Sequence, residues 1–261
     1  MRSLDIAATG LAAQQLNVDT ISHNLANMTT TSYKSERPEF QDLLYQDLRR
    51  VGVNSTDQGT ILPVGVQIGL GVKTGAISRN TSQGPLENTE GPLDMAVQGK
   101  GYFQVELPDG TIAYTRDGSF KLSEDGTIVT RDGFTVQPAI TIPDNAESIS
   151  INASGEVAVI ITGQVDAQQL GQLELSSFIN PAGLQATGDN MYLETTASGG
   201  PLLNNPGQDG MGTLLQGYLE TSNVNPVAEI TDLIVAQRAY EMNTKVLSAA
   251  DQMLQSLNQS V

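Results

Sequence analysis

The sequence contains no cysteine and no tryptophan, and only 5% of its 261 residues are aromatic. Without thiols the chain can form no disulfide framework, no zinc–thiolate site and no cysteine nucleophile. Long apolar runs are also missing. The longest, VAVII at residues 157–161, is far shorter than the roughly 20 residues that span a membrane. No secretory signal is recognisable, because Asp5 falls where its apolar segment would begin. We therefore expect neither a membrane anchor nor Sec-dependent export.

Basic residues are few. Thirteen Lys and Arg stand against 29 Asp and Glu, for a net charge of -16, which argues against nucleic acid and anionic membranes as partners. Residues 80–215 hold 17 acidic and 4 basic residues, a net of -13. Residues 34–79, with six basic and five acidic residues, are the least acidic non-helical part. We expect the acidic middle to face water.

An amphipathic helix is predicted over residues 3–28, with Ser3 as a plausible N-cap. Two interleaved sets of positions, each seven residues apart, carry its stripe: Leu4, Leu11, Val18 and Leu25, and Ala7, Gln14, Ile21 and Met28. This is the a/d heptad pattern of a helix that packs against another helix. Gly10 costs the isolated helix about 1 kcal/mol relative to alanine.

The C-terminal end shows the same pattern. Asn225-Pro226 predicts a helix start. The heptad positions that follow are Leu233, Tyr240, Leu247 and Leu254, and Ala236, Asn243, Ala250 and Leu257. Because each terminal stripe needs an apolar partner, we expect the two helices to pair with each other as a coiled coil. Their small and polar seam residues would leave apolar surface exposed for neighbouring copies to cover.

Strands and turns are predicted between the helices. Residues 95–137 alternate apolar and polar side chains and contain four Asp-Gly runs, which we interpret as type I′ hairpin turns. Further strands are expected at 140–142, 148–152, 156–162, 171–178 and 190–195. Residues 41–80 show no clear helix or strand pattern.

The predicted fold class is α+β and discontinuous, with a β-rich domain and an extended arm inserted between the paired terminal helices. Its expected parts are the N-terminal helix, 1–32; the arm, 33–75; the β-rich outer domain, 76–214; and the C-terminal helix, 215–261.

Residues with catalytic or ligand-binding chemistry are scarce. His23 is the sole histidine, and Asp19 is its only local acid, so a surface or interface histidine is the favoured interpretation. The Asp-Gly runs lack the alternating ligands and the final glutamate of an EF-hand. GLGVKTG at 69–75 misplaces the third glycine of a dinucleotide loop, and no helix follows it. We expect no enzyme activity, no metal site and no cofactor.

The polar stretch SHNLANMTTTSYK, residues 22–34, carries a family resemblance. It resembles the signature of the flagellar rod and hook proteins at Asn24, Ala26, Asn27, Thr30, Tyr33 and Lys34. It departs at Ser32, where the family commonly has glycine. Residues 222–247 resemble the family's C-terminal motif, with matches at Gln237, Arg238, Ala239, Tyr240, Glu241 and Asn243. Residues 99–138 are similar to the shared β domain, so the resemblance covers nearly the whole chain.

This resemblance implies a structural subunit of the bacterial flagellar rod, a helical tube that transmits torque and passes exported subunits through its lumen. Residues 45–77 and the length resemble the distal rod, and a proximal rod or hook protein is the alternative. The implied partners are further copies of the chain, proximal rod proteins below, the hook protein above, the surrounding P- and L-ring proteins and the flagellar type III export apparatus. The implied location is the basal body, where the rod spans the periplasm to the outer membrane.

Two other classes are weaker. A secreted binding module trimerised by its helices would need one coiled-coil end, whereas this chain has two. A hydrolase would need an acid–base set that the sequence does not show.

Three groups of residues are therefore candidates for function. The expected subunit interface is the set of helix seams: Leu4, Leu11, Val18, Ile21, Leu25, Leu233, Tyr240, Leu247 and Leu254. The family motif is Asn24, Ala26, Asn27, Tyr33, Lys34, Gln237 and Arg238, and the expected arm contacts are Arg49 and Arg50.

Overall fold

A computed structural model of the chain describes residues 2–49, 65–163 and 166–259. They form two compact units. The first unit combines residues 1–26, 36–79 and 225–261, and the second combines 27–35 and 80–224. Two helices pack together in the first unit and the second is rich in strands, so the predicted α+β class is confirmed.

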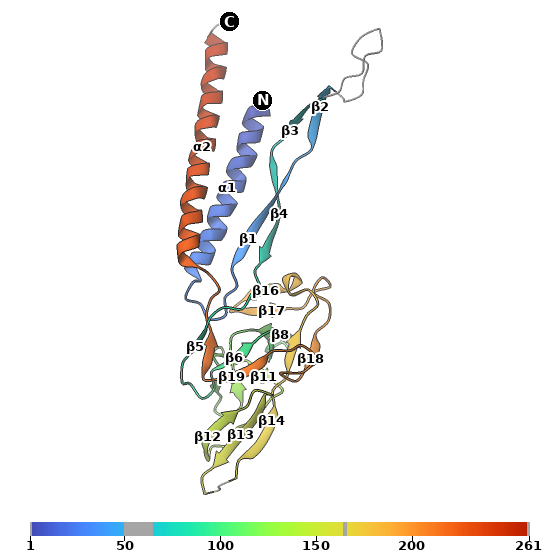
Figure 1. The fold of residues 1–261 in the computed structure, drawn as a ribbon, viewed down its shortest axis with the longest axis vertical. Coiled ribbons are helices and arrows are strands. Elements are labelled where there is room, and N and C mark those ends of the chain that lie inside the picture. The colour runs from blue at the N-terminus through green and yellow to red at the C-terminus, as the bar shows by residue number, and fades with distance from the viewer. Residues whose placement is uncertain (1, 50–64, 164–165, 260–261) are drawn as a thin grey trace. The chain divides into compact units, whose positions relative to one another are not determined.

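The first unit contains both helices, α1 (Arg2–Ala26) and α2 (Pro226–Gln259), which run antiparallel side by side (Figure 1). The helix start predicted at Asn225-Pro226 is confirmed. The Oδ1 atom of Asn225 accepts hydrogen bonds from the backbone N–H groups of Val227 and Ala228, at 3.1 and 3.4 Å. This N-cap satisfies donors that the first helical turn leaves without partners.

Two strand pairs complete the first unit. β1 (Glu36–Asp42) pairs antiparallel with β4 (Val72–Arg79), and β2 (Tyr45–Arg49) pairs antiparallel with β3 (Val66–Gly69). The sequence did not reveal these strands, because their side chains are mostly exposed on both faces and therefore do not alternate. Both β1 and β4 pack against α1.

A seven-stranded sheet of order β16-β17-β8-β7-β11-β10-β9 forms the largest part of the second unit (Figure 1). Beside it lie the three-stranded sheet β12-β13-β14 and the pairs β6–β19, β15–β18 and β5–β20. The bounds are β5 Leu86–Asn88, β6 Met95–Gln98, β7 Phe103–Glu106, β8 Ile112–Thr115, β9 Lys121–Leu122, β10 Ile128–Val129, β11 Thr135–Gln137, β12 Ala146–Ile151, β13 Glu156–Ile161, β14 Gln168–Gln172, β15 Leu175–Ser177, β16 Gln185–Gly188, β17 Met191–Leu193, β18 Leu202–Asn204, β19 Thr213–Gln216 and β20 Tyr218–Glu220, with a 3₁₀ turn at Pro181–Gly183.

The predicted strands at 148–152, 156–162 and 190–195 are confirmed as β12, β13 and β17. The stretch 171–178 instead divides between the end of β14 and β15. The strand predicted at 140–142 is wrong, because this segment makes only the single bridge Thr127↔Thr141. Its apolar residues reflect burial in the core rather than membership of a sheet.

The turns at the Asp-Gly runs do not have the predicted type I′ geometry. At three of the four Asp-Gly runs only the glycine has positive φ, at Gly110, Gly126 and Gly133. In the first of them Gly110 N donates to Leu107 O, and Leu107 N donates to Thr111 O, one residue beyond the glycine. This pattern is the three-residue loop in which a type I turn is followed by a left-handed glycine. A type I′ turn would also require positive φ at the aspartate.

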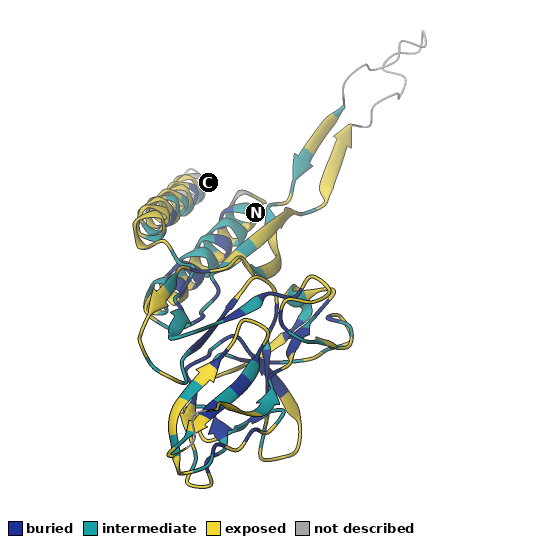
Figure 2. Ribbon diagram, turned by 60° about the horizontal axis from the view of Figure 1, so that its bottom comes forward, coloured by how far each residue is buried: buried dark blue, intermediate teal, exposed yellow. Residues whose placement is uncertain are grey.

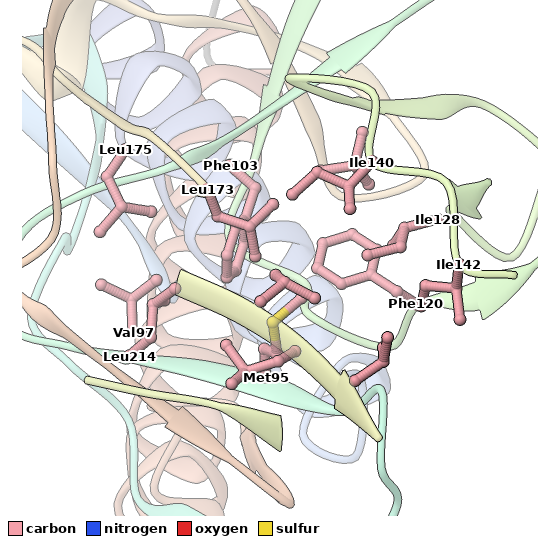
Figure 3. Packing of buried hydrophobic residues seen from close by; sticks show 14 of the residues in the cluster. Met95, Val97, Phe103, Phe120, Ile128, Ile140, Ile142, Leu173, Leu175 and Leu214 are labelled. Atoms are coloured by element: carbon pink, nitrogen blue, oxygen red, sulfur yellow. The ribbon is translucent and has the colours of Figure 1, made fainter. Parts of the chain in front are cut away.

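The hydrophobic core lies in the second unit (Figure 3). The Phe103 and Phe120 rings meet edge to face at its centre, with centroids 5.0 Å apart. Other fully buried members include Met95, Val97, Ile128, Val136, Val157, Leu173, Leu175 and Leu214. Within the described residues no helix is long and apolar enough to cross a membrane.

Gly118 belongs to the one remaining Asp-Gly run, Asp117-Gly118, and it allows the packing of the core to be tested. A Cβ atom at this position would lie 1.6 Å from the backbone oxygen of Met95. We expect Gly118→Ala to lower the free energy of unfolding by about 1–3 kcal/mol, because the backbone beside the core must shift. Gly200→Ala is the matched control, since nothing lies within 4 Å of its added Cβ. Equal denaturation midpoints for the two variants would contradict this packing.

Candidate functional site

The predicted seam residues lie on α1 and α2, which pack against each other. Ile21 is buried, at 5% exposure, whereas Tyr240 is 42% exposed. The remaining seam residues are half-buried: Leu4, Leu11, Val18, Leu25, Leu233, Leu247 and Leu254. Small residues of the two helices are also buried, namely Ala7 and Ala13 of α1 and Ala236 and Ala250 of α2. A Cβ on Gly10 would lie 3.2 Å from Asn243 Nδ2, so Gly10 allows close approach to α2.

α2 is exposed along much of its length (Figure 2), and many of its exposed side chains are apolar. Eight of its large apolar side chains are between 42% and 75% exposed: Val227, Ile230, Ile234, Val235, Tyr240, Met242, Val246 and Met253. Apolar surface of this extent on one helix is typical of an interaction surface.

Asn24, from the family motif, joins three elements of the first unit. Its Nδ2 donates to the backbone oxygen of Glu36 at 2.8 Å and to Glu229 Oε1 at 3.2 Å, and its Oδ1 accepts from Glu36 N at 2.8 Å. The amide thus holds the start of β1 and the first turn of α2 against α1. Burial raises the pKa of Glu229, and the hydrogen bond from Asn24 offsets this only in part.

Lys34, also from the motif, lies in a buried charge cluster of the second unit. Its side chain is 5% exposed and contacts Glu220 Oε1 at 2.5 Å. Arg116 Nε donates to Glu220 Oε2 at 2.8 Å, and the Glu220 side chain is fully buried. Gly84 N also donates to Glu220 Oε1. One carboxylate therefore holds together segments that are far apart in the sequence.

Arg116 uses its remaining donors on backbone. Its guanidinium donates to the carbonyl oxygens of Val97, Gly99 and Gly101. Burial alone raises the pKa of Glu220, but the charges of Arg116 and Lys34 outweigh burial and hold that pKa below its ordinary 4.5. Burial lowers the pKa of Lys34 below its ordinary 10.5, and its contact with Glu220 offsets this only in part.

Ser32 has the left-handed conformation that glycine adopts readily, with φ of 57°. The backbone at this position therefore favours glycine. In this chain the serine hydroxyl donates to Arg116 O at 2.9 Å, and Ser32 N donates to Glu220 O at 2.7 Å. These hydrogen bonds help to hold a conformation that is strained for a residue with a Cβ.

The other motif residues are placed as follows. Asn27 Oδ1 accepts from Thr30 Oγ1 at 3.0 Å, just beyond the end of α1. Tyr33 is half-buried, and its backbone oxygen accepts from Asn223 N. Ala26 is exposed at the end of α1.

On α2, Gln237 and Arg238 are both exposed. Gln237 borders a groove of about 420 Å³ together with Gln15, Val18, Tyr240 and Glu241. Arg49 is exposed on β2, and Arg50 lies outside the described residues.

Two findings differ from the sequence analysis. Tyr33 and Lys34 were expected to begin the extended arm, but Lys34 is buried against Glu220, and the first strand after the motif begins at Glu36. Arg116 directly precedes an Asp-Gly run that was interpreted as a hairpin turn, yet it is part of a buried cluster. Sequence reasoning missed Arg116 and Glu220 because they are 104 residues apart and match no motif. Among the described residues, no group of three or more acidic, histidine or cysteine side chains could hold a metal ion.

Comparison with known proteins gives consistent matches along the chain. The family model described as flagella basal body rod protein matches residues 4–34. That of the flagellar hook protein FlgE/F/G D1 domain matches 96–159, and that of the flagellar basal body rod FlgEFG protein C-terminal region matches 215–260.

Whole-length relatives agree. The chain is 56% identical over 259 residues to the flagellar basal-body rod protein FlgG of Caulobacter vibrioides, with 99% of both chains covered. It is 47% identical to FlgG of Borreliella burgdorferi, covering 97% of this chain and 96% of the relative. It is 38% identical to FlgG of Bacillus subtilis, with 98% of both chains covered.

Because Glu220 is the carboxylate between two buried cations, we predict that neutralising it strongly destabilises the folded chain. Glu220→Gln would leave the buried cations Lys34 and Arg116 without a counter-charge, so we expect the free energy of unfolding to fall by about 3–5 kcal/mol at neutral pH. Glu124→Gln, at an exposed glutamate, is the control. Urea denaturation of both variants measures the difference, and equal losses would contradict a structural role for Glu220.

Glu220→Gln also tests how the free energy of unfolding changes as the pH falls. In the unfolded chain the Glu220 carboxyl binds a proton near pH 4.5, and in the folded chain only at lower pH. In that window the unfolded chain binds more protons, so stability falls as the pH drops from about 4.5 through the folded pKa. We expect Glu220→Gln to lack this part of the acid dependence.

Proposed function

The chain belongs to the FlgG family of flagellar basal-body rod proteins, and from this premise we propose how it builds the distal rod. As a structural subunit it polymerises into a helical tube, which transmits torque from the motor to the hook and passes exported subunits through its lumen. The family is structural and not enzymatic.

The observation that carries this proposal is the exposed apolar surface of α2. One helix can cover only one side of another, and α1 leaves side chains such as Val235 and Met242 about 60% exposed. Burying each such side chain contributes about 1.5–3 kcal/mol. Further copies of the chain supply the missing partners, and a contact of this kind that does not close on itself produces a filament.

We also propose the finer organisation. α1 and α2 act as an antiparallel coiled coil that lines the tube. The bounds expected from the sequence, 1–32 and 215–261, also took in residues 27–32 and 215–224, which belong to the second unit. Residues 33–75 act as an arm that lies across adjacent copies, with its strand pairs as the stiff part. Residues 76–214 form the outer β-rich domain.

Connectivity supports a role in carrying load. The chain passes between its two units four times, after Ala26, Ser35, Arg79 and Val224. Force applied to one unit is therefore shared by four covalent connections. Clusters that hold these segments within their own unit, such as the one at Glu220, resist pulling at the points where the chain enters and leaves.

The further partners follow from the family. The proposed neighbours are proximal rod proteins below, the hook protein above, and the P- and L-ring proteins around the rod. The proposed export route is the flagellar type III apparatus, and the proposed location is the rod between the inner part of the basal body and the outer membrane.

Deletion of the gene tests the function. We expect basal bodies purified from the deletion strain to lack the outer segment of the rod and the hook, because later subunits have nothing to assemble on. Negative-stain images with and without a plasmid copy of the gene provide the measurement. Rods of full length with hooks in the deletion strain would refute the proposal.

Charge reversal tests the arm. Arg49→Glu combined with Arg50→Glu should weaken the rod, because it adds acidic charge to the segment that we place against the acidic middle of a neighbour. Lys121→Glu, a reversal on the exposed strand β9, is the control. The readout is the fraction of basal bodies that keep a rod after exposure to acid or salt, and equal fractions for all variants would exclude this contact.

A further inference from the structure

α2 carries a second apolar heptad, displaced by one residue from the heptad that faces α1. Successive residues lie about 100° apart around a helix, so this second stripe lies about 100° from the α1-facing side. Its members are Val235, Ala239, Met242, Val246, Ala249 and Met253. The four large side chains in this set, named here the second seam, are 53–61% exposed.

The second seam borders a groove on one side of the helix pair. This groove has a volume of about 490 Å³, and its lining includes Ile6 and Thr9 of α1, Gly71 and Val72 at the turn between β3 and β4, and Val246 of α2. Val72 N donates to Thr9 Oγ1 at 3.3 Å, which fixes that turn to α1. The groove is therefore lined by α1, α2 and the turn between β3 and β4, all from the same unit.

α1 presents a different surface on the opposite side of the pair. Its exposed face, named here the small face, repeats at intervals of three and four residues: Ala8, Ala12, Gln15, Asp19, Ser22 and Ala26. Gln15 borders the groove shared with Gln237 and Glu241, away from the β3–β4 turn. The small face and the second seam thus point to opposite sides of one helix pair.

The two surfaces are complementary in side-chain size and in charge. The small face would let another helix approach closely, which suits the large side chains of the second seam. Arg238 and Lys245, seven residues apart, follow the outer edge of the second seam, and the small face carries Asp19. Neither these two cations nor Asp19 forms an ion pair with any residue that the structure describes.

We propose that the small face of α1 in one copy docks on the second seam of α2 in the next copy, with Asp19 beside Arg238. This inference rests on the proposed function and names the surfaces that join the copies. Because the two surfaces are different and lie on opposite sides of the pair, every added copy offers a fresh second seam or small face. Such a heterologous contact propagates into a tube instead of closing as a dimer.

The absence of native cysteine allows a direct test. In copies of equal orientation, the neighbour's α1 runs antiparallel to α2, as α1 does within the chain. We would combine Ala8→Cys or Ala12→Cys with Met242→Cys or Val246→Cys, four double variants that allow for different heights of the neighbouring copy. A disulfide requires Cα atoms within about 7 Å. Mild oxidation of purified basal bodies should give a ladder of covalent multimers on a denaturing gel for at least one pair.

Ala12→Cys with Thr244→Cys is the matched control, because Thr244 is exposed on a different side of α2. No ladder should form with it. The docking is overturned if all four test pairs stay monomeric in basal bodies that carry complete rods, or if the control forms an equal ladder. The proposed function, in contrast, would fall if the chain were absent from such rods, so the two failures are distinguishable.

A charge exchange adds an independent readout. Arg238→Glu and Asp19→Arg each place like charges side by side, and each should reduce spreading in soft agar. The double variant restores opposite charges and should recover it. Loss in both single variants without recovery in the double variant would argue against this pairing.

Discussion

The whole arrangement depends on one constraint: α2 has apolar residues on more sides than a single partner helix can cover. Its α1-facing heptad is buried only in part within the chain, most deeply at the small residues Ala236 and Ala250. These small residues bring the two helices close together, but the larger apolar side chains of α2 lie outside the contact with α1. Their burial requires other chains, so the stability of the first unit and the assembly of the rod draw on the same surface.

The second unit differs from the first in how its apolar side chains are buried. It has a core of fully buried side chains and does not need neighbours to bury them. Its least ordinary feature is the carboxylate of Glu220 between two cations. A buried cluster of this kind adds little net stability compared with apolar packing, but it is costly to break and it fixes geometry. It holds Lys34, whose segment leads on to β1 in the sequence, at one defined place.

How much of this was visible in the sequence depends on the range of each signal. Heptads and Asn225-Pro226 are local, and they predicted α1 to within two residues at each end and the start of α2 at Pro226. The C-terminal part assigned to 215–261 was too long, because it also took in the end of β19 and all of β20. β1 and β4 escaped because their exposed faces leave no alternation. Asp-Gly is compatible with more than one turn, so it predicted the hairpins but not their geometry. The Glu220 cluster joins residues 104 and 186 positions apart, which no local pattern can reveal.

The N-terminal motif and the surface proposed for assembly are different parts of the chain, whereas the C-terminal motif, which includes Arg238, borders the second seam. Asn24, Ser32 and Lys34 make their contacts inside the subunit, where each buried polar atom needs its own partner and tolerates little change. The second seam has only to remain apolar and of similar volume, a requirement that many sequences meet. The N-terminal motif thus reports which contacts hold the subunit in its folded shape. The surface that joins copies has to be found from unsatisfied periodicity, which is why α2 is more informative about assembly than the signature itself.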